Sequence, residues 1–386
     1  MYDARTPARM MWKLLALPLA LAPEVRGATA PAPWLSDLAQ RVDVYGRLDA
    51  NLALSREDVY VANNGSRFGI QAEQSIVGKL KVLGKGEWRM NIGKGDTSYN
   101  ISDNPNTGFS QFESTTSQAL TTRLGFVGLS FGDYGTLTLG KQWGVYYDIS
   151  FWTDQYAVFG ARGSSTYNAG TDGGETGGGR ANDALIYRVD LGKLQLGAQA
   201  QFIDSRSPAL DGLAGSLIFA PVRGLRLGVA YSHSFLDLNS NIVGYDRKDA
   251  QAFTAGITFE RDGWKIAALD TWTHDHELVA TDQATVAYDT LGAELFVSRR
   301  VRDLFLFYAG FDFAIPQGLD TQFVDPNFGT RDLLAGARWL LDVQANSFVY
   351  AEGRTGQTRA VNGQRAEDVL TLGIRFNYSL RRSIGL

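Results

Sequence analysis

Few side chains in this sequence have the chemistry of a catalytic or metal-binding group. The chain has three histidines and no cysteine, so it offers neither a thiol nucleophile nor a cysteine zinc site. His274 and His276 flank Asp275, and in a strand this spacing would place both imidazoles on one face. Two histidines are a weak ligand set, and a solvated loop is the preferred interpretation of this segment. We therefore predict no metal site and no cofactor.

Two further segments contain residue types found in active or ligand sites. His233 lies between Ser232 and Ser234, but neither a Gly-x-Ser-x-Gly elbow nor a phosphate-binding lysine loop occurs in the chain. The glycine-rich run at 170–179 lacks the spaced acids of a calcium loop and is interpreted as a flexible connector. We predict that the protein is not an enzyme. A hydrolase centred on His233 is kept as the less favoured alternative.

The charge balance argues against nucleic-acid binding. The chain has 37 lysines and arginines against 41 acids, a net charge of -4, and no basic stripe. Composition is uniform along the 386 residues, without the proline-serine run or charge block of a linker. We expect one large domain.

The first thirty residues are organised like an export signal. Basic residues up to Lys13 precede a short apolar run at 14–22, and small residues follow. Cleavage is expected within 22–30; the alternative interpretation is an amphipathic helix of a cytoplasmic protein. The predicted organisation is a signal peptide at 1–30, a short lead at 31–41 and a single domain at 42–386.

From Val42 onward, apolar residues recur with a period of two. Val42 and Val44 alternate with Asp43 and Tyr45, which gives a strand one apolar and one polar face. Such runs, about ten residues long like a tilted strand that crosses a bilayer, recur about sixteen times. They begin near Val42, Ser66, Leu80, Thr121, Thr136, Ala184, Leu194, Ala214, Leu225, Lys248, Trp264, Thr285, Leu304, Asp332, Ser347 and Asp368.

The gaps between these runs alternate between short and long. Short gaps such as 77–79, 192–193 and 261–263 hold the Gly and Asp residues of tight hairpins. Long polar gaps lie at 55–65, 93–120, 144–183, 236–247, 274–284 and 316–331. This rhythm places every long connection at one end of the sheet. The sequence therefore predicts an all-β, transmembrane antiparallel barrel with short periplasmic turns and long outer loops.

Several segments resemble Gram-negative general porins, in order along the chain. They are VDVYGR at 42–47, SRFG at 66–69, TRLGFVGL at 122–129, FGDYGTLTLG at 131–140, and GVYYD at 144–148 leading to Thr153-Asp154 and Phe159-Gly160. The last segment resembles the porin constriction loop. The similarity extends from about residue 42 to about residue 203.

The resemblance implies a homotrimer of sixteen-stranded barrels in a Gram-negative outer membrane, each with its third loop folded into the lumen. The basic pore wall of the family maps onto Arg47, Arg67, Arg123 and Arg180. Strand alternation places the first three opposite the apolar faces of their strands, which agrees with a position in the lumen. The lumen is also the favoured side because an arginine on the lipid side at mid-membrane costs about 2–4 kcal/mol. The alternative places these arginines at the rim, against lipid headgroups.

The acidic side of the expected pore matches the family only in part. Asp154 occupies the position of one family carboxylate, whereas Val158 lies where a second is expected. Arg162 either adds to the positive side or is solvated in the loop. Because rings of fixed charge set ion preference, the missing acid predicts weak anion selectivity.

The implied function is passive diffusion of small hydrophilic solutes and ions through a water-filled channel. Expected partners are outer-membrane lipids, lipopolysaccharide and further copies of the chain. A substrate-specific channel is the alternative, because loop aromatics such as Tyr147 and Trp152 could line a solute track. The final strand pattern stops at Tyr378 and Leu380 without a terminal aromatic residue, which concerns assembly efficiency rather than the fold.

Overall fold

The computed structural model describes the barrel strands and most of their connections. The described residues are 41–56, 59–90, 97–98, 113–114, 120–167, 172–174, 176–203, 210–235, 242–243, 249–280, 285–319, 321–342 and 347–383. The predicted signal peptide, its cleavage site and lead residues 31–40 lie outside this set.

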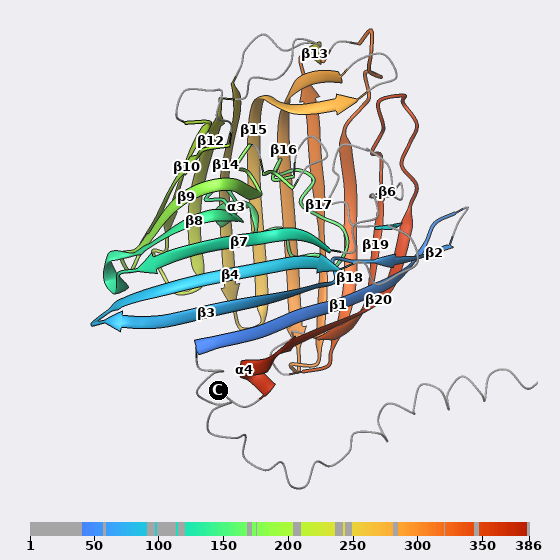
Figure 1. Cartoon of the computed structure of the whole chain (residues 1–386). Coiled ribbons are helices and arrows are strands. Elements are labelled where there is room, and N and C mark those ends of the chain that lie inside the picture. Colours follow the sequence, from blue (N-terminus) through green and yellow to red (C-terminus); the bar gives the residue numbers. More distant parts are fainter. Residues whose placement is uncertain are drawn as a thin grey trace, which may run out of the picture.

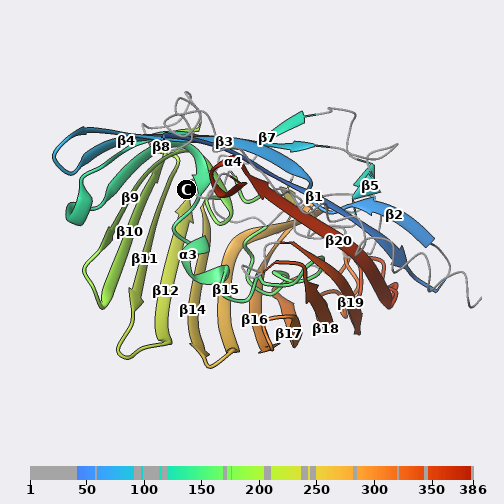
Figure 2. The same cartoon turned by 90° about the horizontal axis from the view of Figure 1, so that it is seen from below.

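Sixteen long strands of the described chain form one closed ring (Figure 2). They are β1 (Val42–Leu54), β3 (Arg67–Val77), β4 (Leu80–Met90), β7 (Leu120–Ser130), β8 (Thr136–Trp143), β9 (Arg180–Asp190), β10 (Leu194–Gln201), β11 (Gly212–Phe219), β12 (Leu225–Ser234), β14 (Ala250–Arg261), β15 (Trp264–Ala280), β16 (Thr285–Val301), β17 (Phe305–Gln317), β18 (Thr330–Leu340), β19 (Phe348–Gly356) and β20 (Val369–Ser379). Neighbouring strands are antiparallel, and β20 pairs with β1. Closure matters because an unpaired backbone group in lipid costs several kcal/mol. The predicted barrel and its strand number are confirmed.

The other described elements are short strands and helical turns. The short strand β2 (Val59–Asn63) pairs with β1, β13 (Ile242–Val243) pairs with β16, and β5 (Thr97–Ser98) pairs with β6 (Glu113–Ser114). Helical turns occur at η4 (Gly132–Tyr134), α3 (Tyr147–Ser150) and α4 (Leu380–Ser383) (Figure 1). Within the described ranges, no helix is both long and apolar enough to cross a membrane.

The connections alternate in length, as predicted. The turn between β14 and β15 consists of Asp262 and Gly263, whose φ angles of 52° and 78° suit the twist of a two-residue hairpin. One predicted loop is wrong: 274–284 belongs largely to strands, since β15 continues to Ala280 and β16 begins at Thr285. A register shift between Thr273 and Glu277 accommodates the polar segment within the strand.

The barrel is apolar outside and polar inside. Phe307 and Ile374 expose 51% and 52% of their surface, whereas Asp49 and Glu352 are fully buried. Gln199 and Gln201 face inward, as the alternation of their strand predicts. Exposed apolar side chains recur on nearly every strand, which suits a surface surrounded by lipid.

Candidate pore constriction

The connection between β8 and β9 folds into the ring (Figure 2). We call residues 144–179 the constriction loop; it contains α3. Tyr146, Ile149 and Trp152 of this loop are almost fully buried. They pack against apolar residues on the inner wall formed by β11, β12, β14 and β15. The loop therefore covers this side of the wall and narrows the lumen.

Glycines on the inner wall make room for the constriction loop. A Cβ at Gly228 of β12 would lie 2.4 Å from Ile149. A Cβ at Gly292 of β16 would lie 1.9 Å from the carbonyl oxygen of Gly163 in the loop. A Cβ at Gly310 of β17 would lie 1.7 Å from the Leu295 carbonyl oxygen of the wall and 2.2 Å from the Tyr156 hydroxyl of the loop. At Gly292 the atoms that a Cβ would meet are loop backbone, so a larger residue there would push the loop away from the wall.

We expect Gly292→Ala to lower the single-channel conductance, because the new methyl group displaces the loop into the lumen. Overpacking of this kind costs about 1–3 kcal/mol. The matched control is Gly353→Ala on β19, where a Cβ would meet no atom closer than 3.8 Å. Planar-bilayer recordings of both variants test the prediction, which fails if both conduct like the parent protein.

A buried carboxylate holds the tip of the constriction loop. Glu352 of β19 accepts hydrogen bonds from three consecutive backbone N–H groups, at 2.5, 2.8 and 2.6 Å. The donors are Ala157, Val158 and Phe159. The Tyr308 hydroxyl donates a fourth bond at 2.6 Å. These bonds satisfy a buried charge that would otherwise be costly.

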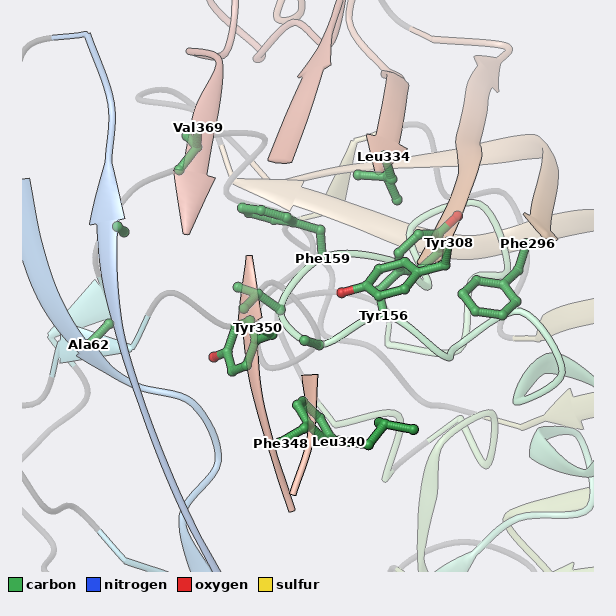
Figure 3. Packing of buried hydrophobic residues seen from close by; sticks show 13 residues of the cluster. Ala62, Tyr156, Phe159, Phe296, Tyr308, Leu334, Leu340, Phe348, Tyr350 and Val369 are labelled. Atoms are coloured by element: carbon green, nitrogen blue, oxygen red, sulfur yellow. The ribbon is translucent and has the colours of Figure 1, made fainter. Parts of the chain in front are cut away.

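Neighbouring wall residues continue this attachment. Glu294 of β16 accepts a bond from the Gly163 N–H at 2.8 Å and another from the Thr153 hydroxyl. Aromatic packing surrounds the same region: Figure 3 shows Tyr156 and Phe159 of the loop among wall side chains. These wall residues include Phe296, Tyr308, Leu334, Phe348, Tyr350 and Val369. The loop tip is thus held by both charge and apolar contact.

A polar cavity lies between the loop and the opposite, arginine-bearing wall. Its lining includes Arg47 of β1, Arg67 of β3, Arg123 of β7, Arg180 of β9, and Asp154 and Val158 of the loop. Six of the seven residues selected from the sequence therefore meet at one cavity. Arg162 is absent from this lining.

Glu87 of β4 is a central residue of this wall that the sequence analysis does not identify. Its carboxylate accepts a bond from Arg123 Nε at 3.0 Å and lies 3.7 Å from Arg67 Nε. The Tyr45 hydroxyl donates to its other oxygen at 3.0 Å. Lys85, Glu87 and Arg89 alternate along β4, so the period-two pattern contained the signal for an inward position.

Arg338 and Arg375 also line the cavity and are missing from the sequence-based set. Arg375 of β20 pairs with Asp49 and donates to the Ala157 carbonyl at 2.9 Å. Arg338 of β18 donates to the Gln155 carbonyl at 2.5 Å. Both arginines therefore support the loop from the wall. Alternation places them inward, but only the fold shows that they reach the loop.

The loop carboxylates lie in different electrostatic settings. Asp154 accepts bonds from the Tyr147 and Tyr167 hydroxyls at 2.7 and 3.1 Å. Burial raises the pKa of Asp154 above its usual value, and these bonds act against the shift. Burial also acts to raise the pKa of Asp172. The facing Arg180 and Lys141 outweigh burial and hold the pKa of that carboxyl below its usual value.

Comparison with known proteins identifies the family. A family model described as Gram-negative porin matches residues 27–383. The chain belongs to the Gram-negative porin family. Outer membrane porin N of Escherichia coli strain K12 is 27% identical to this porin over an alignment of 392 positions, gaps included. The alignment covers 91% of this chain and 96% of that protein. Outer membrane protein F of Serratia marcescens is 29% identical over 259 residues, covering 63% of this chain and 62% of that protein.

Solved porin structures share the fold. A Salmonella typhi OmpF complex with daunomycin has a TM-score of 0.68 at 18% identity, covering 88% of this chain and 99% of that one. An anion-selective porin from Comamonas acidovorans has a TM-score of 0.61 at 15% identity, with coverages of 87% and 99%. Vibrio cholerae OmpT in its trimer form has a TM-score of 0.61 at 17% identity, with the same coverages. This porin is an outer-membrane channel protein and not an enzyme.

Arg162 of the porin takes neither of its two expected positions. Its side chain is 2% exposed, and its Nη1 lies 3.2 Å from the Asp332 carboxylate of β18. The Arg162 N–H donates to Asp312 of β17 at 3.1 Å. The residue is therefore neither solvated nor part of the cavity, because the loop turns toward acidic acceptors on the wall.

The described part of the glycine-rich run is packed, and its interpretation as a flexible connector is wrong. Asp172 and Gly174 accept backbone bonds from Arg180 and Asn182 of β9, each at 2.9 Å. Gly173, Gly174 and 176–179 are buried. Contacts with β9 order this segment despite its composition.

The histidines do not form the arrangements considered from the sequence. Ser232 and Ser234 are buried, whereas His233 is partly exposed on the opposite face of β12 and lies 3.4 Å from Asp249. No hydrolase centre is assembled there among the described residues. His276 is buried beside Glu277 and His274 is partly exposed, so the two imidazoles do not share a face.

Proposed function

We propose that this porin is an anion-preferring diffusion channel for small hydrophilic solutes. The observation that carries the proposal is the charge of the cavity lining. Six arginines and one carboxylate line the cavity among the described residues. Fixed charges at a narrow point favour ions of opposite sign. Arg47, Arg67, Arg123 and Arg180 would form the positive side and Asp154 the negative side.

Partial neutralisation within the wall limits the proposed preference. Glu87 faces Arg67 and Arg123, whereas Arg47 donates to the neutral amide of Asn377 at 3.0 Å. Arg338 likewise donates to a backbone carbonyl. Arg47 and Arg338 are therefore the arginines whose charge is expected to act most directly on passing ions.

Reversal potentials across a potassium chloride gradient test the ion preference. We expect anion selectivity in the parent protein, a weaker preference in Arg47→Ser and a stronger one in Asp154→Asn. Arg302→Ser is the control, because this exposed residue lies in the turn between β16 and β17. A cation preference in the parent protein would refute the proposal.

General diffusion is favoured over a substrate-specific track because charged and polar groups dominate the cavity lining. Tyr147 and Tyr167, which could contribute to an aromatic track, use their hydroxyls to bind Asp154. In liposome swelling, we expect rates to fall smoothly with solute size. Saturation by one solute class would instead support the specific channel.

We further propose that the porin is a homotrimer, supported by its fold-level likeness to Vibrio cholerae OmpT, which is described in a trimer form. Residues 1–30 would be removed as a signal peptide, leaving a lead at 31–41 and one barrel domain to residue 386. Lipids and lipopolysaccharide would contact the exposed apolar band. Unheated electrophoresis should show a band at three times the monomer mass; a monomer band alone would contradict the trimer.

A further inference from the structure

Three metal-ligating side chains converge outside the constriction, on β15 and β16. They are His274, Asp275 and Asp289, and one ligand atom of each lies within 4.8 Å of the other two. His274 Nδ1 is 3.0 Å from both carboxylate oxygens of Asp289. His274 Nε2 is 3.5 Å from Asp275 Oδ2. The imidazole therefore lies between two carboxylates.

An irregularity in β15 creates this convergence. In a regular strand, Asp275 would point to the face opposite His274. Here the register shifts between Thr273 and Glu277, and Asp275 has a φ of 49°. The Asp275 N–H donates to Asp289 at 2.9 Å. Two consecutive residues can thus approach the same carboxylate, as β-bulges allow.

The cluster is negatively charged and accessible. With the imidazole neutral, as metal ligation requires, the two carboxylates contribute two negative charges. Within the described residues, Asp289 forms one ion pair, and its partner is His274. The side chains of His274 and Asp289 are 28% and 31% exposed, whereas that of Asp275 is 7% exposed. A small cation could therefore reach His274 and Asp289 from outside the barrel wall.

The location is the lipid-facing side of the barrel, toward its long-loop end. Trp272 precedes His274 on the same face and is 41% exposed. Its ring lies parallel to the imidazole, with the two ring centroids 6.1 Å apart. Leu291, on the same face as Asp289, is 48% exposed. The site is therefore separate from the lumen and from ion passage.

We propose that His274, Asp275 and Asp289 bind a divalent transition-metal ion, for which Zn²⁺ is the best fit. Zinc takes imidazole and carboxylate ligands at about 2.0–2.2 Å, so neighbouring ligand atoms of a tetrahedral site lie about 3.3 Å apart. Only one ring nitrogen of His274 can bind the ion. One ligand atom from each of the three residues lies within 4.8 Å of the other two, so these atoms would have to move together by up to about 1.5 Å around the ion. Three protein ligands leave a fourth position for water.

Zinc titration of the purified, folded porin after chelator treatment tests the site. Calorimetry is expected to find one zinc site per chain. His274→Ala and Asp289→Asn should each weaken it at least about tenfold, since loss of even an outer-shell partner costs 10–100-fold in affinity. Asp289→Asn is nearly isosteric, and heat-modifiable electrophoretic migration reports whether each variant is folded.

His233→Ala is the matched control. His233 also faces an aspartate, Asp249 at 3.4 Å, but it belongs to no cluster of three ligands in the described residues. This variant should keep the affinity of the parent protein. Absence of zinc binding in the parent protein, unchanged affinity in folded Asp289→Asn, or loss of binding in His233→Ala would each overturn the proposal.

Discussion

Replacing Glu352 by alanine is expected to detach the tip of the constriction loop and to lower the mean single-channel conductance with frequent closures. Three backbone N–H groups and the Tyr308 hydroxyl would lose their acceptor. A hydrogen bond to a charged group contributes about 1.5–3 kcal/mol, so the loss is large for a short segment. The wall blocks movement outward, and a detached tip can therefore move only into the lumen. Planar-bilayer recordings measure both effects.

Two variants test whether the carboxylate itself holds the loop. Glu352→Gln keeps one acceptor oxygen but turns an NH₂ group toward the same donors, so an intermediate effect is expected. Glu73→Ala is the exposed control, because its ion pair with Lys81 lies at the surface. Such pairs contribute about 0–1 kcal/mol. Parent-like recordings from Glu352→Ala would show that other contacts suffice to hold the tip.

Replacing Arg162 by methionine is expected to lower the free energy of unfolding by about 3–5 kcal/mol, because it leaves the Asp332 carboxylate buried without its cation. Both side chains of this pair are at most 3% exposed. Denaturant titration of the reconstituted protein measures the change. In the double variant Arg162→Met with Asp332→Asn, much of the loss should be recovered. The amide oxygen introduced by Asp332→Asn would still accept the bond that the Thr358 hydroxyl donates to Asp332 at 2.6 Å.

Arg365→Met is the matched control for this pair. Arg365 and Asp368 are also 3.2 Å apart, but their side chains are 44% and 59% exposed. Solvent screening should limit the effect of that substitution to about 1 kcal/mol or less. If Arg162→Met and Arg365→Met change stability equally, burial does not determine the strength of the Arg162 pair.

The strands were predictable because their signal is local. Alternation along Leu370, Leu372, Ile374 and Phe376 determines which face of β20 meets lipid, whatever its neighbours are. The same logic failed at 274–284, where consecutive polar residues suggested a loop. A bulge absorbs those residues within β15, and bulges have no simple sequence signature.

The candidate site was only partly predictable. The resemblance to porins located Arg47, Arg67, Arg123, Arg180, Asp154 and Val158, all of which line one cavity. It did not locate Glu87 or Arg375, whose alternation identifies an inward position but no partner. The resemblance also could not predict that Arg162 lies outside the cavity, because a loop has no periodicity that predicts the directions of its side chains.

By itself, the sequence determined that this porin is a barrel of about sixteen strands, apolar outside and polar inside, because a period of two is a property of each strand alone. Only the tertiary structure decided which inward groups meet. Arg375 and Asp49 are 326 residues apart, and Glu352 lies 193 residues from Phe159. Barrel closure and the inward fold of the constriction loop bring these groups together. The electrostatics of the pore therefore depend on contacts that no local pattern records.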